Sequence, residues 1–201
     1  MQELEAKFYV RHLKPFEQKL IALGANILRP RILETNLRFD TPDHQLSQRL
    51  QMLRLRKAHT NTLTYKGASQ VVDGASQRQE IEIEVEDFGA AMALLEALGY
   101  QVSSIYEKYR TEYKSNSLLV TLDELPFGKF IEIEGSDTLF IRQLANQLGL
   151  KWSANITANY LMLLDHFNQT LNIPLRDLTF ENFAGLTITP QDLGVSPADE
   201  D

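Results

Sequence analysis

The stretch Glu3-Leu4-Glu5-Ala6-Lys7 places a charge at every second position, with apolar or small residues between the charges. Residues 132–134, Glu-Ile-Glu, repeat the pattern much later in the chain. Alternation with a period of two is typical of a β-strand whose two faces differ. Each of these strands is therefore predicted to have one charged face and one apolar face.

Similar alternation runs through most of the chain, and it is longest at residues 78–86. We expect strands at residues 2–11, 33–40, 52–57, 62–66, 78–86, 102–114, 118–124 and 129–134. Apolar residues spaced by three and four predict helices at 15–23, 87–98, 137–148 and 157–171. The first three helices end at Leu-Gly, where glycine is a common stop signal. Residues 67–74 are expected to form a loop between strands.

The whole composition is that of one ordinary globular domain, with 201 residues, 43% hydrophobic and 23% charged. No apolar run is long enough to span a membrane, no signal peptide is visible, and there are no cysteines, so the cytoplasm is the expected compartment. The net charge of −7 argues against a general nucleic-acid-binding surface. Residues 172–201 contribute −5 of this charge, so the rest of the chain is nearly neutral and can still hold a positive cavity.

Five or six separate strands carry two or more charges on one face. The simplest interpretation is an antiparallel sheet whose charged face lies in water. A closed barrel with helices packed outside would instead enclose the charges in a lumen. Unpartnered buried charges are too costly, so such a lumen must be hydrated and hold a ligand carrying both signs of charge. A divalent metal ion with a polyphosphate fits, because carboxylates bind Mg²⁺ or Mn²⁺ and Lys and Arg bind phosphate oxygens.

These motifs resemble, in order, those of the CYTH superfamily, the triphosphate tunnel metalloenzymes. The matching elements are the ExExK stretch at 3–7, Arg-Phe-Asp-Thr-Pro-Asp at 38–43, Leu-Arg-Leu-Arg at 53–56, Lys-Gly at 66–67, Arg-Gln-Glu-Ile-Glu at 78–82, Lys-Tyr-Arg at 108–110, Leu-Asp at 122–123 and Gly-Lys-Phe-Ile-Glu-Ile-Glu at 128–134. The pair Asn159-Tyr160 lies where a Ser-Tyr pair is common in the family. The length and the helix at 87–98 are most similar to the CyaB-like branch, which includes class IV adenylate cyclases.

The resemblance implies an α+β fold with an antiparallel tunnel barrel of roughly eight strands and helices outside. It also implies roles for the charged residues. Divalent-metal ligands would be Glu3, Glu5, Glu80, Glu82, Glu132 and Glu134. The phosphates would be bound by Lys7, Arg54, Arg56, Lys66, Arg78, Lys108 and Arg110, and all of these except Arg78 join Glu5 in the expected catalytic set. Arg38 and Asp123 lie in matched motifs, and either could instead be a supporting salt-bridge partner.

We expect residues 1–170 to form the tunnel domain and 171–201 to form an acidic extension, disordered at 196–201. The leading function is metal-dependent hydrolysis of inorganic triphosphate or of a nucleoside or organic triphosphate. Cyclisation of ATP to cyclic AMP and pyrophosphate would use the same lumen, and a binding module without turnover is a third possibility. The four histidines show no metal-binding spacing, and no Walker A, GxSxG or GxGxxG motif is present. Oligomeric state, the choice between Mg²⁺ and Mn²⁺ and the role of the tail stay open.

Overall fold

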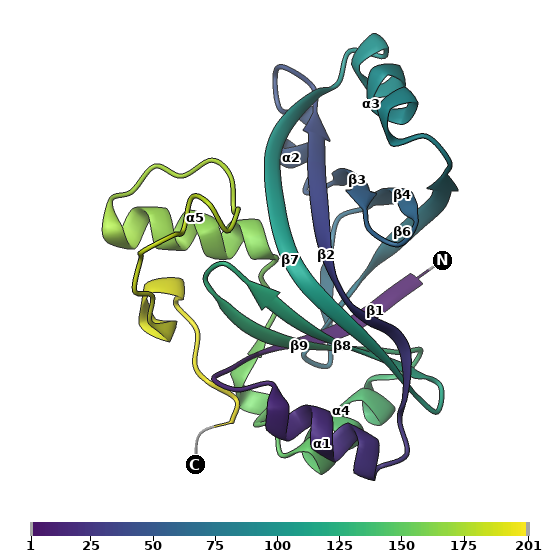
Figure 1. The fold of residues 1–201 in the computed structure, drawn as a ribbon, viewed down its shortest axis with the longest axis vertical. Coiled ribbons are helices and arrows are strands. Elements are labelled where there is room, and N and C mark those ends of the chain that lie inside the picture. The colour runs from purple at the N-terminus through teal and green to yellow at the C-terminus, as the bar shows by residue number, and fades with distance from the viewer. Residues whose placement is uncertain (1, 200–201) are drawn as a thin grey trace.

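The fold is a single sheet of ten strands with helices outside it, described for residues 2–199 by a computed structural model (Figure 1). The strands are β1 (Gln2–Val10), β2 (Asn26–Asp40), β3 (Met52–Lys57), β4 (Asn61–Lys66), β5 (Gln70–Val72), β6 (Ala75–Val85), β7 (Gln101–Ser115), β8 (Leu118–Leu125), β9 (Gly128–Glu134) and β10 (Asn155–Ile156). The helices are α1 (Lys14–Ala22), α2 (Gln45–Gln48), α3 (Phe88–Ala97), α4 (Thr138–Leu148) and α5 (Tyr160–Leu171), with short 3₁₀ turns at Trp152–Ala154 and Pro190–Leu193. No helix in this described range is long and apolar enough to cross a membrane.

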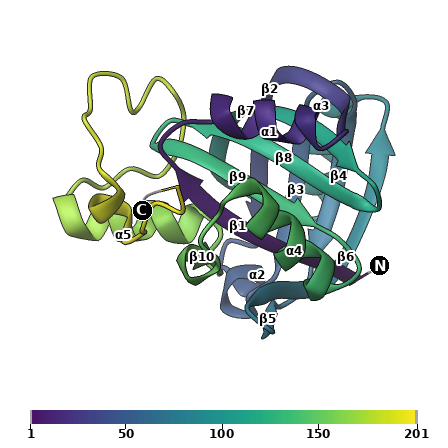
Figure 2. The same cartoon turned by 90° about the horizontal axis from the view of Figure 1, so that it is seen from below.

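Eight of the strands close into a ring in the order β1-β9-β8-β7-β2-β3-β4-β6, because the first residues of β1 also pair with β6 (Figure 2). All the pairings are antiparallel; in the closing pair, for example, Glu3 lies opposite Arg78. The predicted α+β fold with an antiparallel barrel of roughly eight strands is therefore confirmed. Closure turns one face of every strand inward, so the alternating charges share one interior.

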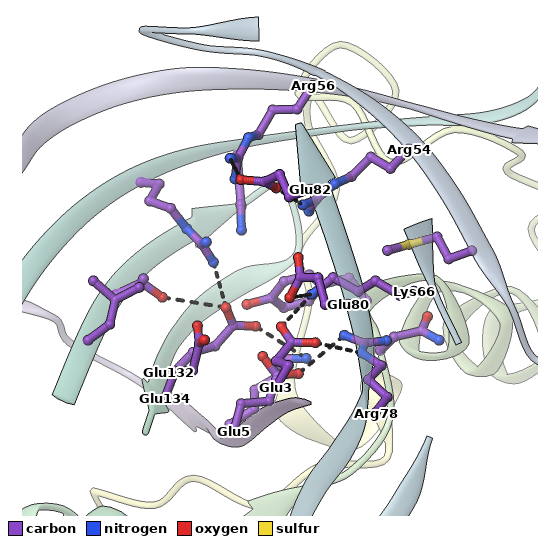
Figure 3. Close-up of a pocket in the computed structure, with 18 of the residues that line it drawn as sticks. Glu3, Glu5, Arg54, Arg56, Lys66, Arg78, Glu80, Glu82, Glu132 and Glu134 are labelled. Carbon is purple, nitrogen blue, oxygen red and sulfur yellow. Dashed lines mark hydrogen bonds and ion pairs between the residues drawn. The ribbon is translucent and has the colours of Figure 1, made fainter. Parts of the chain in front are cut away.

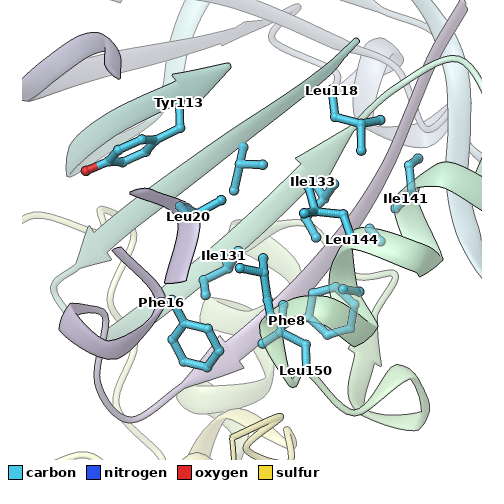
Figure 4. Close-up of a cluster of buried hydrophobic side chains, with 14 of the residues drawn as sticks. Phe8, Phe16, Leu20, Tyr113, Leu118, Ile131, Ile133, Ile141, Leu144 and Leu150 are labelled. Carbon is cyan, nitrogen blue, oxygen red and sulfur yellow. The ribbon is translucent and has the colours of Figure 1, made fainter. Parts of the chain in front are cut away.

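The helices cover the apolar outer face of the ring. Helices α1 and α4 pack on β1, β8 and β9, where Phe8, Ile131 and Ile133 are completely buried (Figure 4). Helix α3 covers β2 and β3, with Leu95 against Phe39 and Leu55. Complete burial of side chains of this size stabilises a fold by about 1.5–3 kcal/mol each. Helix packing outside leaves the inner face to the charged residues.

The expected helix boundaries are close to those observed. Asp87 and Asp137 cap α3 and α4 by accepting backbone N–H groups at 3.0 and 2.8 Å. The glycines that follow α1, α3 and α4 all have positive φ angles. The Leu-Gly stop signals are therefore confirmed, because glycine adopts the left-handed backbone conformation that ends a helix without steric strain.

Two expected features of the strands are wrong. Residues 67–74 are not a simple loop, since β5 pairs there with β6 through a turn at Asp73-Gly74 in which both φ angles are positive. An Asp-Gly pair is a strong signal for this turn type, so the hairpin was visible in the sequence. Strand β2 starts at Asn26 rather than at residue 33, and its first half follows β7 through register shifts that break the alternation. Irregular pairing of this kind leaves no period-two pattern to detect.

The end of the chain packs on α5, on one side of the barrel (Figure 1). Leu178, Phe183 and Leu193 join a buried cluster with Phe167 of α5. The expectation of disorder at 196–201 is wrong for residues 196–199, because Ala198 is fully buried and its N–H donates to the Tyr9 carbonyl at 2.9 Å. Residues 200 and 201 lie outside the described range. The division of the chain at residue 170 stays a prediction.

Candidate functional site

The ring encloses a cavity of about 560 Å³ lined by the charged inner face (Figure 3). It brings together all the residues predicted for metal, phosphate or catalysis: Glu3, Glu5, Lys7, Arg54, Arg56, Lys66, Arg78, Glu80, Glu82, Lys108, Arg110, Glu132 and Glu134. Not assigned from the sequence, but also lining it, are Arg29, Arg38, Met52, Tyr106, Glu112, Thr121 and Tyr160, among others. Glu84 lies further along β6 and is exposed.

Acidic residues gather on the wall made by β1, β9 and β6. Glu5 lies directly opposite Glu134 in the β1–β9 register, an arrangement of like charges that destabilises a sheet. Burial, together with the negative charges of Glu3, Glu5 and Glu80, raises the pKa of Glu134 from 4.5 to about 7, although Lys66 opposes the shift. No ion pair to Glu134 is formed within residues 2–199. This wall therefore has excess negative charge.

Five of the six expected metal ligands form ion pairs with cations within residues 2–199. Glu80 lies 3.3 Å from Lys66, and Glu5 lies 3.5 Å from Arg78. Glu3 accepts from Lys66 and, at 2.8 Å, from Arg78. Burial raises the pKa of Glu3, but these two cations outweigh it and lower the pKa to about 2. Glu132 lies 3.3 Å from Lys7 and 2.5 Å from Arg110, and Glu82 contacts Arg54 and Arg56.

The donor set fits a divalent cation by its chemistry. Glu5, Glu80 and Glu134 supply the hard carboxylate oxygens that Mg²⁺ and Mn²⁺ prefer, and a cation there would relieve the repulsion that raises the pKa of Glu134. The geometry is not closed around an ion, since no three His, Cys, Asp or Glu side chains in the described part of the chain are arranged to hold one. Lys66 and Arg78 instead form ion pairs with the neighbouring carboxylates.

The opposite wall, made by β2, β3 and β7, gathers positive charge. Arg38 lies directly opposite Arg54 in the β2–β3 register. Burial, together with the positive charges of Arg78 and Arg54, lowers the pKa of Arg38, although Tyr106 and Asp40 oppose the shift. No acidic side chain in the described range forms an ion pair with Arg38. Arg54 donates to the Tyr106 hydroxyl at 3.1 Å and to Thr64 at 3.2 Å, which hold its guanidinium against the wall.

Several buried polar atoms in this wall have no hydrogen-bond partner within residues 2–199. They are Nε of Arg54, Oε2 of Glu34 and both side-chain polar atoms of Asn36. An unpaired buried polar atom costs about 1–3 kcal/mol, so such atoms mark a place for water or ligand. Glu34, Asn36 and Arg38 recur at every second position of β2, so the alternation of the sequence could have identified this face.

Asp123 organises the cations of β7. It is completely buried and accepts from Lys108 at 2.9 Å, from Arg110 at 2.7 Å and from the Tyr160 hydroxyl at 3.0 Å. Asp123 does not line the cavity, so of the two interpretations left open by the sequence, the structure supports that of a supporting partner. Tyr160 belongs to the Asn159-Tyr160 pair noted in the sequence, and the centre of its ring also lies 4.4 Å from the Lys7 amine.

Helix α5 packs against one end of the lumen. The inner face of the strands changes there from charged to aromatic: Lys7 is followed by Tyr9 on β1, and Glu132 is preceded by Phe130 on β9. Phe130 packs edge-on against Tyr160, at 5.1 Å between ring centroids. The described part of the acidic tail, residues 172–199, contains no α-helix and packs against α5.

The repulsion around Glu134 gives a prediction about stability. The folded-state pKa of about 7 exceeds the usual 4.5, so the folded protein retains a proton that the unfolded chain loses, and stability decreases between these two pH values. At 1.36 kcal/mol per pKa unit the full penalty above pH 7 is about 3 kcal/mol. We therefore expect Glu134→Gln to raise the melting temperature at pH 8 by about 6–12 °C in EDTA.

Thermal melts at pH 8 and pH 4.5, with Glu84→Gln as the exposed control on the same sheet, check this expectation. The gain should disappear at pH 4.5, where the wild-type Glu134 is protonated. A variant that melts below the wild type at pH 8 would show that Glu134 is not under repulsion.

Three comparisons place this geometry among known proteins. A family model described as the CYTH domain matches residues 1–148. A protein of Methanocaldococcus jannaschii, provisionally named an adenylate cyclase, is 27% identical over 139 residues, which are 68% of this chain and 78% of that protein. A provisionally named adenylate cyclase of Vibrio parahaemolyticus shares the fold with a TM-score of 0.73 and 22% identity, over 81% of this chain and 97% of that one. A provisionally named adenylyl cyclase from Hippeastrum, described as having a dominant triphosphatase activity, aligns with a TM-score of 0.63 and 20% identity over 81% of this chain and 95% of its own.

Proposed function

Because the chain belongs to the CYTH domain family, we propose that it is a divalent-metal-dependent phosphohydrolase that releases the terminal phosphate of inorganic triphosphate or a nucleoside triphosphate. The observation that carries the proposal is the separation of charge inside one cavity. Glu5 and Glu134 repel each other on one wall, and Arg38 and Arg54 repel each other on the facing wall. A ligand with a cation at one side and several anionic oxygens at the other relieves both repulsions.

The acidic and the basic residues of the cavity would have different roles. Glu5, Glu80 and Glu134, with Glu3 and Glu132 beside them, would hold the divalent cation, which supplies neutralisation of phosphate oxygens when it is bound. Lys7, Arg54, Arg56, Lys66, Arg78, Lys108 and Arg110 would bind the phosphates, and Glu82 holds Arg54 and Arg56 in place. Two of these cations, Lys108 and Arg110, are already fixed by Asp123, so little reorganisation is needed when phosphate binds.

The reaction is the attack of water on the terminal phosphorus and the departure of the remaining diphosphate. A carboxylate of the acidic wall orients the water, and the cations neutralise the charge that develops on the bridging oxygen as its bond to phosphorus breaks. Tripolyphosphate plus water then yields pyrophosphate plus orthophosphate. The fold of the Hippeastrum protein, which is described as a triphosphatase, is compatible with this chemistry.

Product analysis tests the proposal. We would offer tripolyphosphate and ATP separately, with Mg²⁺ or Mn²⁺, and we expect orthophosphate to be released from tripolyphosphate. Cyclic AMP and pyrophosphate from ATP would instead support the cyclase function after which the Methanocaldococcus jannaschii relative is provisionally named. Thermal stabilisation by tripolyphosphate with no product from either compound would leave only a binding module.

A further inference from the structure

The edge of β7 is completed by a segment outside the matched CYTH region. Strand β8 pairs with β7 only from Tyr109 to Ser115, so β7 extends beyond β8 toward its own start. Residues 177–180, which we call the strap, pair with this exposed part. The Leu178 N–H donates to the Ile105 carbonyl and the Glu107 N–H donates to the Leu178 carbonyl, both at 2.9 Å. The strap thus takes the place along β7 that β8 leaves open.

Side chains lock the strap at both of its ends. The Asp177 carboxylate accepts the Ile105 N–H at 2.8 Å, and the Glu107 carboxylate accepts the Phe180 N–H at 3.1 Å. The Phe180 ring contacts the Tyr109 ring, with 5.2 Å between centroids. Leu178 itself is completely buried, in the cluster that also contains Tyr106 and Tyr160.

The strap therefore holds β7 on both sides of Lys108. Tyr106 and Lys108 point into the lumen from this part of β7, and the Tyr106 hydroxyl accepts from Arg54. Sheet edges without a partner open locally at low cost, and a misplacement of about 1 Å can reduce activity by as much as about a hundredfold.

We propose that the strap is a positioning element of the phosphate-binding wall, which positions Lys108 through the backbone of β7 and Arg54 through Tyr106. Leu178 is its anchor. This inference rests on the proposed function only for the identity of the ligand, because the contacts between the strap and β7 are independent of that function. The strap lies beyond residue 148, where the CYTH match ends, and its contacts join it to β7 inside the matched region.

The positioning role can be tested by comparing two leucines of the same buried cluster, one in the strap and one outside it. Leu178→Ala removes the anchor, whereas Leu193→Ala removes an equally buried leucine of the C-terminal segment that makes no pairing with β7. Tripolyphosphate binding would be measured by calorimetry without divalent metal, so that no turnover occurs. We expect Leu178→Ala to weaken binding about tenfold and Leu193→Ala to change it less than about twofold. Leu178→Met, which conserves volume, should restore wild-type affinity.

Hydrogen exchange over residues 101–109 provides a readout that needs no ligand. Exchange should accelerate in Leu178→Ala and stay unchanged in Leu193→Ala. Equal losses of affinity in the two alanine variants, or wild-type affinity and exchange in Leu178→Ala, would overturn the positioning role. If the wild type neither binds tripolyphosphate in this assay nor releases orthophosphate from it with Mg²⁺ or Mn²⁺, the proposed function fails, while the exchange data still decide whether the strap fixes β7.

Discussion

Glu5→Gln is expected to reduce orthophosphate release from tripolyphosphate by at least about a hundredfold, because it removes a negative charge where the divalent cation would bind. Glu5 lies opposite Glu134, and within residues 2–199 its one ion pair is a long one, 3.5 Å from Arg78. Glutamine keeps the shape of the side chain but lacks the negative charge with which a carboxylate binds a divalent cation. The loss should therefore appear in the chemical step even at saturating Mg²⁺ or Mn²⁺.

The matched control is Glu84→Gln, an exposed glutamate on β6 outside the cavity, which should keep wild-type rates. Melting curves in EDTA establish that both variants are folded. We expect Glu5→Gln to melt at or above the wild-type temperature, since one of the repelling charges is gone. Near-wild-type turnover by Glu5→Gln at saturating metal would show that the acidic wall is not the metal site.

Asp123→Ala is expected to give the largest loss of stability, about 3–5 kcal/mol, because it leaves buried cations without a partner. Asp123 has no exposed surface and accepts hydrogen bonds from Lys108, Arg110 and Tyr160. A loss of this size lowers the melting temperature of a chain this long by roughly 6–20 °C. The melting temperature of Asp123→Asn should lie between those of Asp123→Ala and the wild type, because asparagine keeps the shape of the side chain but loses its charge.

Denaturant unfolding of Asp123→Ala beside Asp165→Ala, an exposed aspartate on α5, measures this difference. The exposed substitution should change the free energy of unfolding by no more than about 0.5 kcal/mol. If the two variants unfold at the same denaturant concentration, the buried network does not stabilise the barrel. A salt series distinguishes the network from surface pairs such as Arg31–Glu124, since only the exposed pair is strongly screened.

The period-two pattern predicted the eight strands of the barrel, except the first half of β2, and their charged faces, which meet in the cavity. This was possible because alternation is a local property, fixed by the geometry of the extended backbone. The capping aspartates and the Leu-Gly helix ends are local as well, and they were predicted to within a few residues. The order of the motifs added the family, which the match over residues 1–148 confirmed.

The tertiary structure alone decided how the charges are paired. Sequence could not tell that Glu3 and Glu132 are neutralised by cations while Glu134 is left under repulsion, because these pairings join strands far apart in the chain. It could not show that Asp123 supports Lys108 and Arg110 from outside the cavity. The position of the irregular C-terminal segment is likewise set by its contacts with α5 and β7. Such long-range contacts leave no periodic pattern in the sequence from which they could be predicted.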